Sequence, residues 1–168
     1  MPRVDPLVPR GAVNRAYAAF LRTPPGRYIA INVAARVDPK LMRLSRGHLG
    51  IGLTFPTLNL TTTGARSGQP RTATVVYFTD GDDVIAIASS FGRDKHPAWY
   101  HNLRAQPEAR LEARGRGGRY RAEEVSDEAE RERLWALANR VYPGYDDYEA
   151  RVGPNGRRIP ILRFSPLA

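Results

Sequence analysis

The segment from Pro56 to Ser89 constrains the fold most, because it holds three short strand patterns in succession. Residues 58–61 alternate leucine with Asn or Thr, and residues 72–79 form a run of β-branched and aromatic side chains. The triplet Asp80-Gly81-Asp82 separates that run from the apolar residues 84–89 and is a strong hairpin signal. We therefore expect an antiparallel meander at the centre of the fold.

The rest of the chain adds helices and further strands to this meander. Six or so antiparallel strands with helices between them indicate an α+β domain whose sheet curls into a barrel. Residues 1–10 should be extended or disordered. The expected helices are Ala12–Arg22 (ending before Pro24), an amphipathic stretch at 28–35, a short helix from Asp38, Pro97–Ala105, and a helix capped by Ser126 that ends near Tyr142; the expected strands are 109–113 and 119–125, around Gly115–Gly118, and 159–164.

Length and composition favour one compact unit. A chain of 168 residues is a usual domain size, which we divide into an N-terminal extension with amphipathic helices (1–50) and a barrel domain (51–168). The absence of Cys excludes a disulfide framework, a thiolate metal site and a cysteine nucleophile. The three histidines are scattered at 48, 96 and 101, so no metal site is expected. We see no secretory signal and no run long enough to span a bilayer, and therefore expect a cytoplasmic protein.

The positive charge is concentrated at the front of the chain. The formal net charge is +9, and residues 1–60 contribute nine basic and two acidic groups. Such a field attracts nucleic acid, an acidic membrane surface or an anionic small molecule, and composition does not choose among them. The N-terminal helices could lie peripherally on the inner face of a membrane or simply pack on their own domain.

The most pointed local feature is the turn within residues 60–71. Gly64 and Gly68 allow a tight turn, Ser67 offers a hydroxyl, and Arg66 and Arg71 offer guanidinium groups. Such a turn can bind an anion. It matches neither the Walker loop nor the dinucleotide fingerprint, and a plain polar hairpin turn is the alternative.

Three tyrosines form a second candidate. Tyr142, Tyr145 and Tyr148 would make a stripe on one helix face, which either packs as core or walls a cavity for a flat aromatic ligand. Trp99 and His101 are similarly ambiguous. Standard catalytic constellations are missing, so in an enzyme of this kind a bound cofactor would supply the reactivity.

Five segments taken in order resemble the deazaflavin-dependent nitroreductase family. The resemblance extends over about residues 50–165, and it is the shared order and spacing that make it specific. It implies a split antiparallel β-barrel, of the flavin-reductase and pyridoxamine-oxidase type, that passes a hydride from reduced coenzyme F-420 to an organic acceptor such as a quinone or nitro compound. The five segments are residues 61–71, Asp80-Gly81 before a Val-Ile-Ala strand, 96–107, 142–148 and 158–161.

The resemblance also implies site residues. Arg66, Ser67, the neighbouring amides and Arg71 would hold the phosphate and the start of the glutamate tail. The acceptor would meet Ser89, Tyr142, Tyr145 and Tyr148, which we take as the catalytic candidates. The full cofactor set is Ala65, Arg66, Ser67, Arg71, Thr72, Ala73, Thr74, Val75, Val76, Ile87, Ala88, Ser89, Ser90, Ala98, Trp99, Tyr100, His101, Asn102 and Tyr145.

Two positions depart from the family pattern. Val76 stands where nitroreductase members can carry a tyrosine, and Ser90 where a lysine occurs. This bears on nitro-compound reduction more than on cofactor binding. The alternatives are an FMN- or haem-using relative of the same barrel and a basic nucleic-acid-binding module. We expect a small-molecule acceptor, no nucleic-acid partner, and either a monomer or a homodimer.

Overall fold

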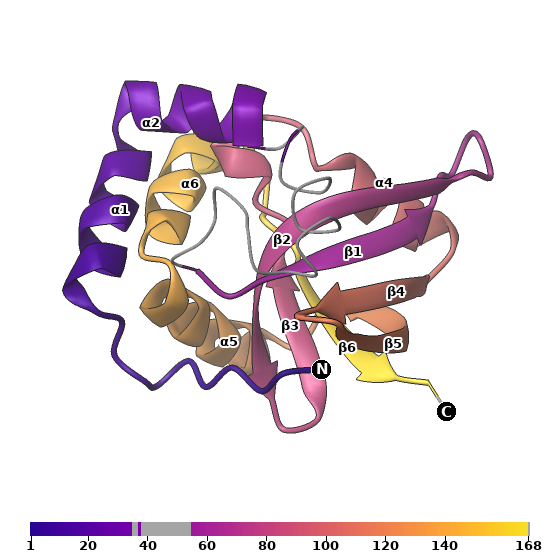
Figure 1. Ribbon diagram of the computed structural model, residues 1–168. Coiled ribbons are helices and arrows are strands. Elements are labelled where there is room, and N and C mark those ends of the chain that lie inside the picture. Colours follow the sequence, from indigo (N-terminus) through magenta and orange to yellow (C-terminus); the bar gives the residue numbers. More distant parts are fainter. Residues whose placement is uncertain (35–36, 38–54, 168) are drawn as a thin grey trace.

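A computed structural model describes residues 1–34, Val37 and 55–167 (Figure 1). Six antiparallel strands close into a barrel in the order β1-β2-β3-β6-β5-β4, as the sequence predicts. Every neighbouring pair is antiparallel, so the tight turns of the meander suffice to connect the first three strands. The strands are β1 (Thr57–Thr63), β2 (Pro70–Asp80), β3 (Asp83–Ile87), β4 (Glu108–Ala113), β5 (Arg116–Glu124) and β6 (Ile161–Pro166).

Alternation along β3 shows where the two cores of the protein lie. Val84 and Ala86 belong to one buried cluster, which contains Leu60 and Leu111 from the opposite side of the barrel. The intervening residues of β3 belong to a second buried cluster shared with the helices. A strand buried on both faces explains why its sequence reads as a continuous apolar run. The barrel interior is thus filled, and most of the helices build a separate apolar layer outside it, whereas Trp99, Tyr100 and Leu103 pack with the barrel cluster.

The helices gather mainly on one side of the barrel. In Figure 1, α1, α2, α5 and α6 lie to the left of the strands, and α4 lies behind β2 and β1. None of the helices in the described part of the chain combines the length and the apolar character needed to cross a bilayer. The helical elements are α1 (Ala12–Arg22), α2 (Pro24–Ile29), η1 (Ala30–Ala34), η2 (Ser90–Gly92), α4 (Ala98–Ala105), α5 (Glu128–Val141), α6 (Gly144–Val152) and η3 (Gly153–Asn155).

The first ten residues form no helix or strand but contain a turn at Pro6 and Leu7, and they are tied to the barrel. The backbone of Val4 exchanges hydrogen bonds with Thr79 on β2, and the Tyr77 hydroxyl donates to the carbonyl of Pro2 over 3.2 Å. Burial raises the pKa of Tyr77 to about 12, so the hydroxyl keeps its proton for this bond at neutral pH. Residues 1–10 therefore provide hydrogen-bond partners for polar groups of β2.

Several expected boundaries differ from the structure. The chain resumes helical structure at Pro24, because proline is accommodated in a first helical turn. The cap of α5 is Asp127, whose Oδ1 accepts from the Glu130 amide over 2.8 Å, and not Ser126. A separate helix, α6, follows α5. The short helix expected from Asp38 lies outside the described residues.

The second hairpin also turns earlier than expected. Arg114 and Gly115 have positive φ of 49° and 70° and make the whole turn, so Gly117 lies within β5. A Cβ at Gly117 would lie 2.1 Å from the carbonyl oxygen of Leu111. That glycine is required by the close approach of β4 and not by the turn.

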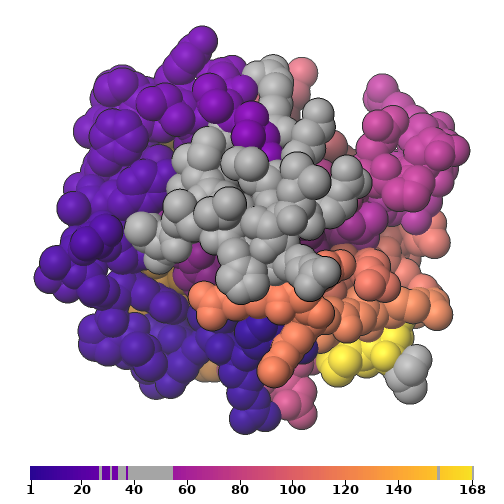
Figure 2. Space-filling view, in the orientation of Figure 1, coloured from indigo at the N-terminus to yellow at the C-terminus, as the bar shows by residue number. Residues whose placement is uncertain are grey.

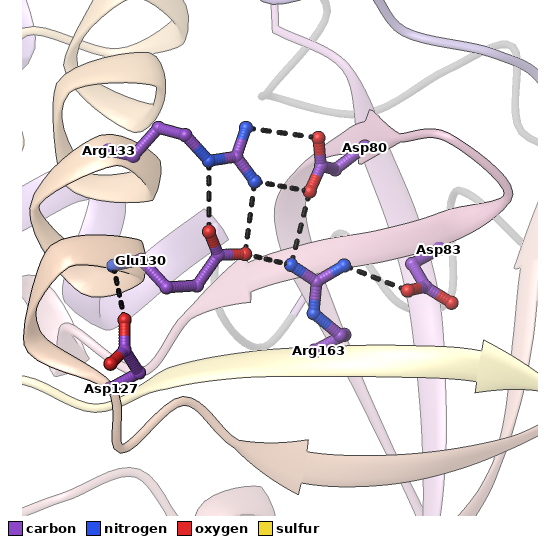
Figure 3. Close-up of polar contacts among 6 residues, drawn as sticks. All are labelled: Asp80, Asp83, Asp127, Glu130, Arg133 and Arg163. Atoms are coloured by element: carbon purple, nitrogen blue, oxygen red, sulfur yellow. Dashed lines mark hydrogen bonds and ion pairs between the residues drawn. The ribbon is translucent and has the colours of Figure 1, made fainter.

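An ion-pair network fastens α5 to the barrel (Figure 3). Arg133 on α5 donates to Asp80 over 2.7 Å and to Glu130 over 2.9 Å. Arg163 on β6 pairs with Asp83 over 2.8 Å and also contacts Asp80 and Glu130. The hydrogen bonds from Arg133 hold the pKa of Asp80 below its ordinary value, although partial burial opposes them. Three segments far apart in sequence are thereby joined.

Candidate functional site

A cavity of about 340 Å³ lies where β2, the end of β3, α1, α4 and the tyrosines meet. Its volume is within the range typical of small-molecule sites, about 300–1,000 Å³. Most of the predicted residues come together on its walls. The predicted residues that line it are Arg71, Thr72, Ala73, Thr74, Val75, Val76, Ile87, Ser89, Ser90, Ala98, Trp99, Asn102, Tyr142, Tyr145 and Tyr148.

The remaining predicted residues lie elsewhere. Ala88 is fully buried in the barrel core. Tyr100 points to the other side of α4, where its hydroxyl donates to Glu124 over 2.8 Å, and His101 is exposed beside His96. Trp99 and Asn102 are three residues apart on α4 and share the face toward the cavity, whereas Tyr100 and His101 do not line it. Ala65, Arg66 and Ser67 lie on the exposed turn between β1 and β2.

That turn projects from the body of the molecule (Figures 1 and 2), and its backbone amides are largely occupied. Ser67 and Gly68 donate to the carbonyl of Gly64, and Gln69 donates to the Ser67 hydroxyl over 3.3 Å. The Ala65 amide donates to the side chain of Asn102 over 3.0 Å. These amides are therefore already hydrogen-bonded, whereas Arg66 and Arg71 are exposed.

Asn102 connects the turn to α4. Its side chain is buried, accepts from the Ala65 amide and donates to the Thr62 hydroxyl over 2.9 Å. One amide side chain thus satisfies two polar groups of the β1–β2 hairpin while its helix lines the cavity. Asn102 positions the hairpin that carries Arg66 and Arg71 relative to the cavity wall.

The three tyrosines come together across two helices. Tyr142 follows the last residue of α5, whereas Tyr145 and Tyr148 lie on α6, so they are not one stripe on one helix. The hydroxyls of Tyr142 and Tyr148 are 2.9 Å apart, and the rings of Tyr142 and Tyr145 meet edge to face with centroids 5.2 Å apart. Gly144 makes this possible, because a Cβ there would lie 2.4 Å from the Tyr142 ring.

Burial is the main influence on all three phenols. It raises the pKa of Tyr142, Tyr145 and Tyr148 above the ordinary value near 10. The neighbouring phenols raise the pKa of Tyr148 further, whereas the bond from Tyr148 opposes the shift at Tyr142. The three groups are neutral at physiological pH and can act as hydrogen-bond donors.

Sequence reasoning missed part of the wall. Tyr17 and Leu21, one helical turn apart on α1, line the cavity, so the N-terminal helix contributes to the site. The apolar face of residues 12–22 was the available signal for that contact. Phe91 and Arg93 also line the cavity, and no local sequence pattern predicts the conformation of their loop. Within the described ranges, no group of His, Asp and Glu is arranged to hold a metal ion.

Comparisons with known proteins agree on one family. A sequence model described as F420H(2)-dependent quinone reductase matches residues 34–165. A curated F420H(2)-dependent quinone reductase of Mycobacterium tuberculosis is 31% identical over 140 residues, which cover 81% of this chain and 91% of the relative. A solved structure titled F420-H2 Dependent Reductase (FDR-A) is 32% identical, with a TM-score of 0.59, and the match covers 66% of this chain and 94% of that one. A second solved chain with the same TM-score and identity, matched over 66% of this chain and 80% of its own length, is titled a domain-swapped dimer.

Proposed function

Because the chain belongs to the F420H(2)-dependent quinone reductase family, we propose that it passes a hydride from reduced coenzyme F-420 to a quinone. The family match supports the F-420-dependent oxidoreductase predicted from the sequence over the FMN- or haem-using alternative and over a nucleic-acid-binding module. The observation that carries the proposal is the cavity, which gathers most of the residues assigned from the family resemblance.

The residues present fit such a cofactor. The segment Thr72–Val76 and Ile87 offer a wall of methyl groups and short side chains suited to a flat ring system. Arg71 stands at the same wall, and the exposed Arg66 lies on the adjoining turn. We assign these two arginines to the phosphate and the acidic tail, because guanidinium groups pair bidentately with both. When bound in its reduced form, F-420 supplies a hydride from C5 of its deazaflavin.

The tyrosines and Ser89 would serve the acceptor. A quinone that accepts a hydride also needs one proton to become a hydroquinone, so a neutral donor near its oxygen favours the reaction. With Tyr148 donating to Tyr142, the Tyr142 hydroxyl keeps its own proton for a quinone oxygen. The raised pKa of this group makes it a hydrogen-bond donor, and water can restore its proton.

Titration of the protein into F-420, followed by fluorescence, tests cofactor binding. We expect Arg71→Ala to weaken binding by about tenfold or more, because a charge-assisted bond contributes about 1.5–3 kcal/mol. Arg116→Ala is a matched control, since Arg116 is an exposed hairpin arginine at the β4–β5 turn. Absence of any fluorescence change at micromolar wild-type protein would overturn the proposal.

A second proposal concerns the place in the cell at which the protein meets its quinone. Val13 and Phe20 lie seven residues apart on α1, with exposed fractions of 76% and 42%, and Tyr28 and Ile29 are exposed nearby. The opposite face of α1 packs inward through Ala18. We propose that this outer face contacts an anionic membrane surface, helped by the basic front of the chain.

Sedimentation with vesicles tests this placement. Wild type should cosediment with vesicles containing phosphatidylglycerol and stay in solution with purely zwitterionic ones. A Val13→Glu, Phe20→Glu double variant should lose the binding without losing F-420 affinity. Equal recovery of both proteins with anionic vesicles would argue against membrane contact through α1.

A further inference from the structure

The loop between β3 and α4 has backbone conformations that side chains disfavour, and it forms one wall of the cavity. Ser90 and Phe91 have φ of 54° and 57°, and Gly92 follows at 68°. Left-handed conformations are uncommon for residues other than glycine, and bulky ones adopt them least. Two in succession persist only where surrounding contacts determine the backbone. The contacts that hold this loop therefore decide the shape of the wall.

One side chain from a distant part of the sequence supplies several of those contacts. Arg157, between η3 and β6, donates to the carbonyl of Ala88 over 2.9 Å and to that of Ser89 over 3.3 Å. It donates to the carbonyl of Arg93 as well, and its Nε donates to Nδ1 of His96 over 3.3 Å. A single planar guanidinium thus binds both ends of the strained segment.

Helix α6 closes the loop from the opposite side. Gly92 packs against Tyr148, and a Cβ there would lie 3.1 Å from the Tyr148 ring and 2.8 Å from Nη1 of Arg151. The Arg151 guanidinium in turn lies 5.7 Å from the Tyr148 ring centroid. Movement of the loop would therefore disturb the tyrosine cluster as well as the wall.

We propose that Arg157 is a positioning residue for the reaction. It holds residues 89–93 in the strained conformation that brings Ser89, Ser90 and Phe91 to the cavity wall, and it does not line the cavity itself. The catalytic consequence rests on the proposed function, whereas the restraint on the loop does not.

His96 makes this restraint sensitive to protonation. Nδ1 accepts from Arg157 only when it carries a lone pair, so the imidazole must be neutral with its proton on Nε2. The groups facing it are Arg157, Tyr100, His101 and Glu124. Burial, Arg157 and His101 hold the pKa of His96 below its ordinary value, and Glu124 opposes them. Protonation would set an N–H against the guanidinium and weaken its hold.

The first test compares neighbouring arginines. Arg157→Lys keeps the charge but loses the planar fork, while Arg158→Lys alters an exposed residue paired with Glu128 on α5. In Arg157→Lys we expect the amides of Gly92 and Arg93, which bond within the loop, to exchange hydrogen about tenfold faster or more. Turnover with menadione should fall by about 10- to 100-fold, because catalysis is sensitive to small misplacements. Arg158→Lys should match wild type in both measurements.

The positioning role of Arg157 and the proposed function can be overturned independently. Exchange in Arg157→Lys that equals wild type, or faster exchange with undiminished turnover, would overturn the positioning role. A wild type that neither binds F-420 nor reduces menadione would overturn the proposed function, and the exchange comparison would still decide whether Arg157 restrains the loop.

A second variant keeps the proposal testable if Arg157→Lys fails to fold. His96→Gln offers Arg157 an acceptor oxygen that does not titrate over the physiological range. Wild-type turnover should fall, and the protection factors of the loop amides, which correct for the intrinsic pH dependence of exchange, should also fall, as the pH drops below about 6.5, the ordinary histidine value. His96→Gln should show a flatter profile for both. Parallel pH profiles in the two proteins would contradict the role of His96.

Discussion

Helix α5 takes part in two regions that satisfy polar groups in opposite ways. Near its start it joins the ion-pair network, where Asp80, Asp83 and Glu130 receive hydrogen bonds from Arg133 and Arg163 at the partly exposed rim of the barrel. Its C-terminal end adjoins the tyrosine cluster, in which Tyr142 follows the helix and Tyr145 and Tyr148 lie on α6 beside the cavity. There, the hydroxyls of Tyr142 and Tyr148 hydrogen-bond to each other, and all three phenols are buried.

This difference indicates that the ion-pair network stabilises the fold, whereas the tyrosine cluster is available to a ligand. In the network, charges already have their partners, so a ligand would gain little by approaching. In the cavity, donors and a strained backbone face open space, which is costly for stability and useful for binding. We therefore expect changes in the network to alter unfolding, and changes around the cavity to alter turnover.

The largest effect should come from Gly144→Ala. A Cβ there would lie 2.4 Å from the Tyr142 ring, so the phenol must move away from Tyr148. We expect menadione turnover to fall by about 100-fold. Gly153→Ala is the matched control, because nothing lies within 4 Å of the added Cβ, and steady-state kinetics on both variants make the comparison.

The next largest effect should come from a change in the ion-pair network. Arg163→Met leaves Asp83 and Asp80 without one of their charged donors, at a site where the side chains are about three-quarters buried. We expect the free energy of unfolding to drop by about 2 kcal/mol, with F-420 affinity unchanged. Urea denaturation with a parallel cofactor titration measures both. A weaker cofactor affinity with normal stability would reverse our assignment of the two regions.

Tyr148→Phe sharpens the comparison inside the cavity. It keeps the ring but removes one hydroxyl from a neutral hydrogen bond, so we expect a loss of about 1 kcal/mol in unfolding free energy. Turnover should fall by up to about tenfold, because Tyr142 loses the hydrogen bond from Tyr148 that holds its pKa lower and makes it a better proton donor. An unaltered turnover would indicate that the hydroxyl pair is purely structural.

The smallest effect should appear in the pH dependence of stability. The pKa of Asp80 is lowered in the folded state, so its contribution is full above the unfolded value of about 3.9 and is lost as the pH falls below it. Wild type should therefore lose its advantage over Asp80→Asn as the pH falls through this range. Denaturation curves of the two proteins at several pH values would show the gap closing, and a constant gap would exclude the linkage.

Much of the fold could be predicted because its signals are local. Leucines at alternate positions of β1 predict one buried face, and the Asp-Gly-Asp triplet predicts the β2–β3 turn. The boundaries of α1 agree with the apolar face of residues 12–22. Where the prediction was wrong, a neighbour or a cap decided: Leu111 requires Gly117 inside a strand, and Asp127 caps α5 one residue later than expected.

By itself, the sequence determined most of the strand and helix pattern, the absence of cysteine chemistry and the family, because these follow from residue types and their order along the chain. Only the tertiary structure decided that Asn102 joins a helix to a turn, that the tyrosines meet across two helices, and that Arg157 restrains a loop more than sixty residues earlier. Such contacts depend on how separate elements pack in space, and no local pattern records that packing.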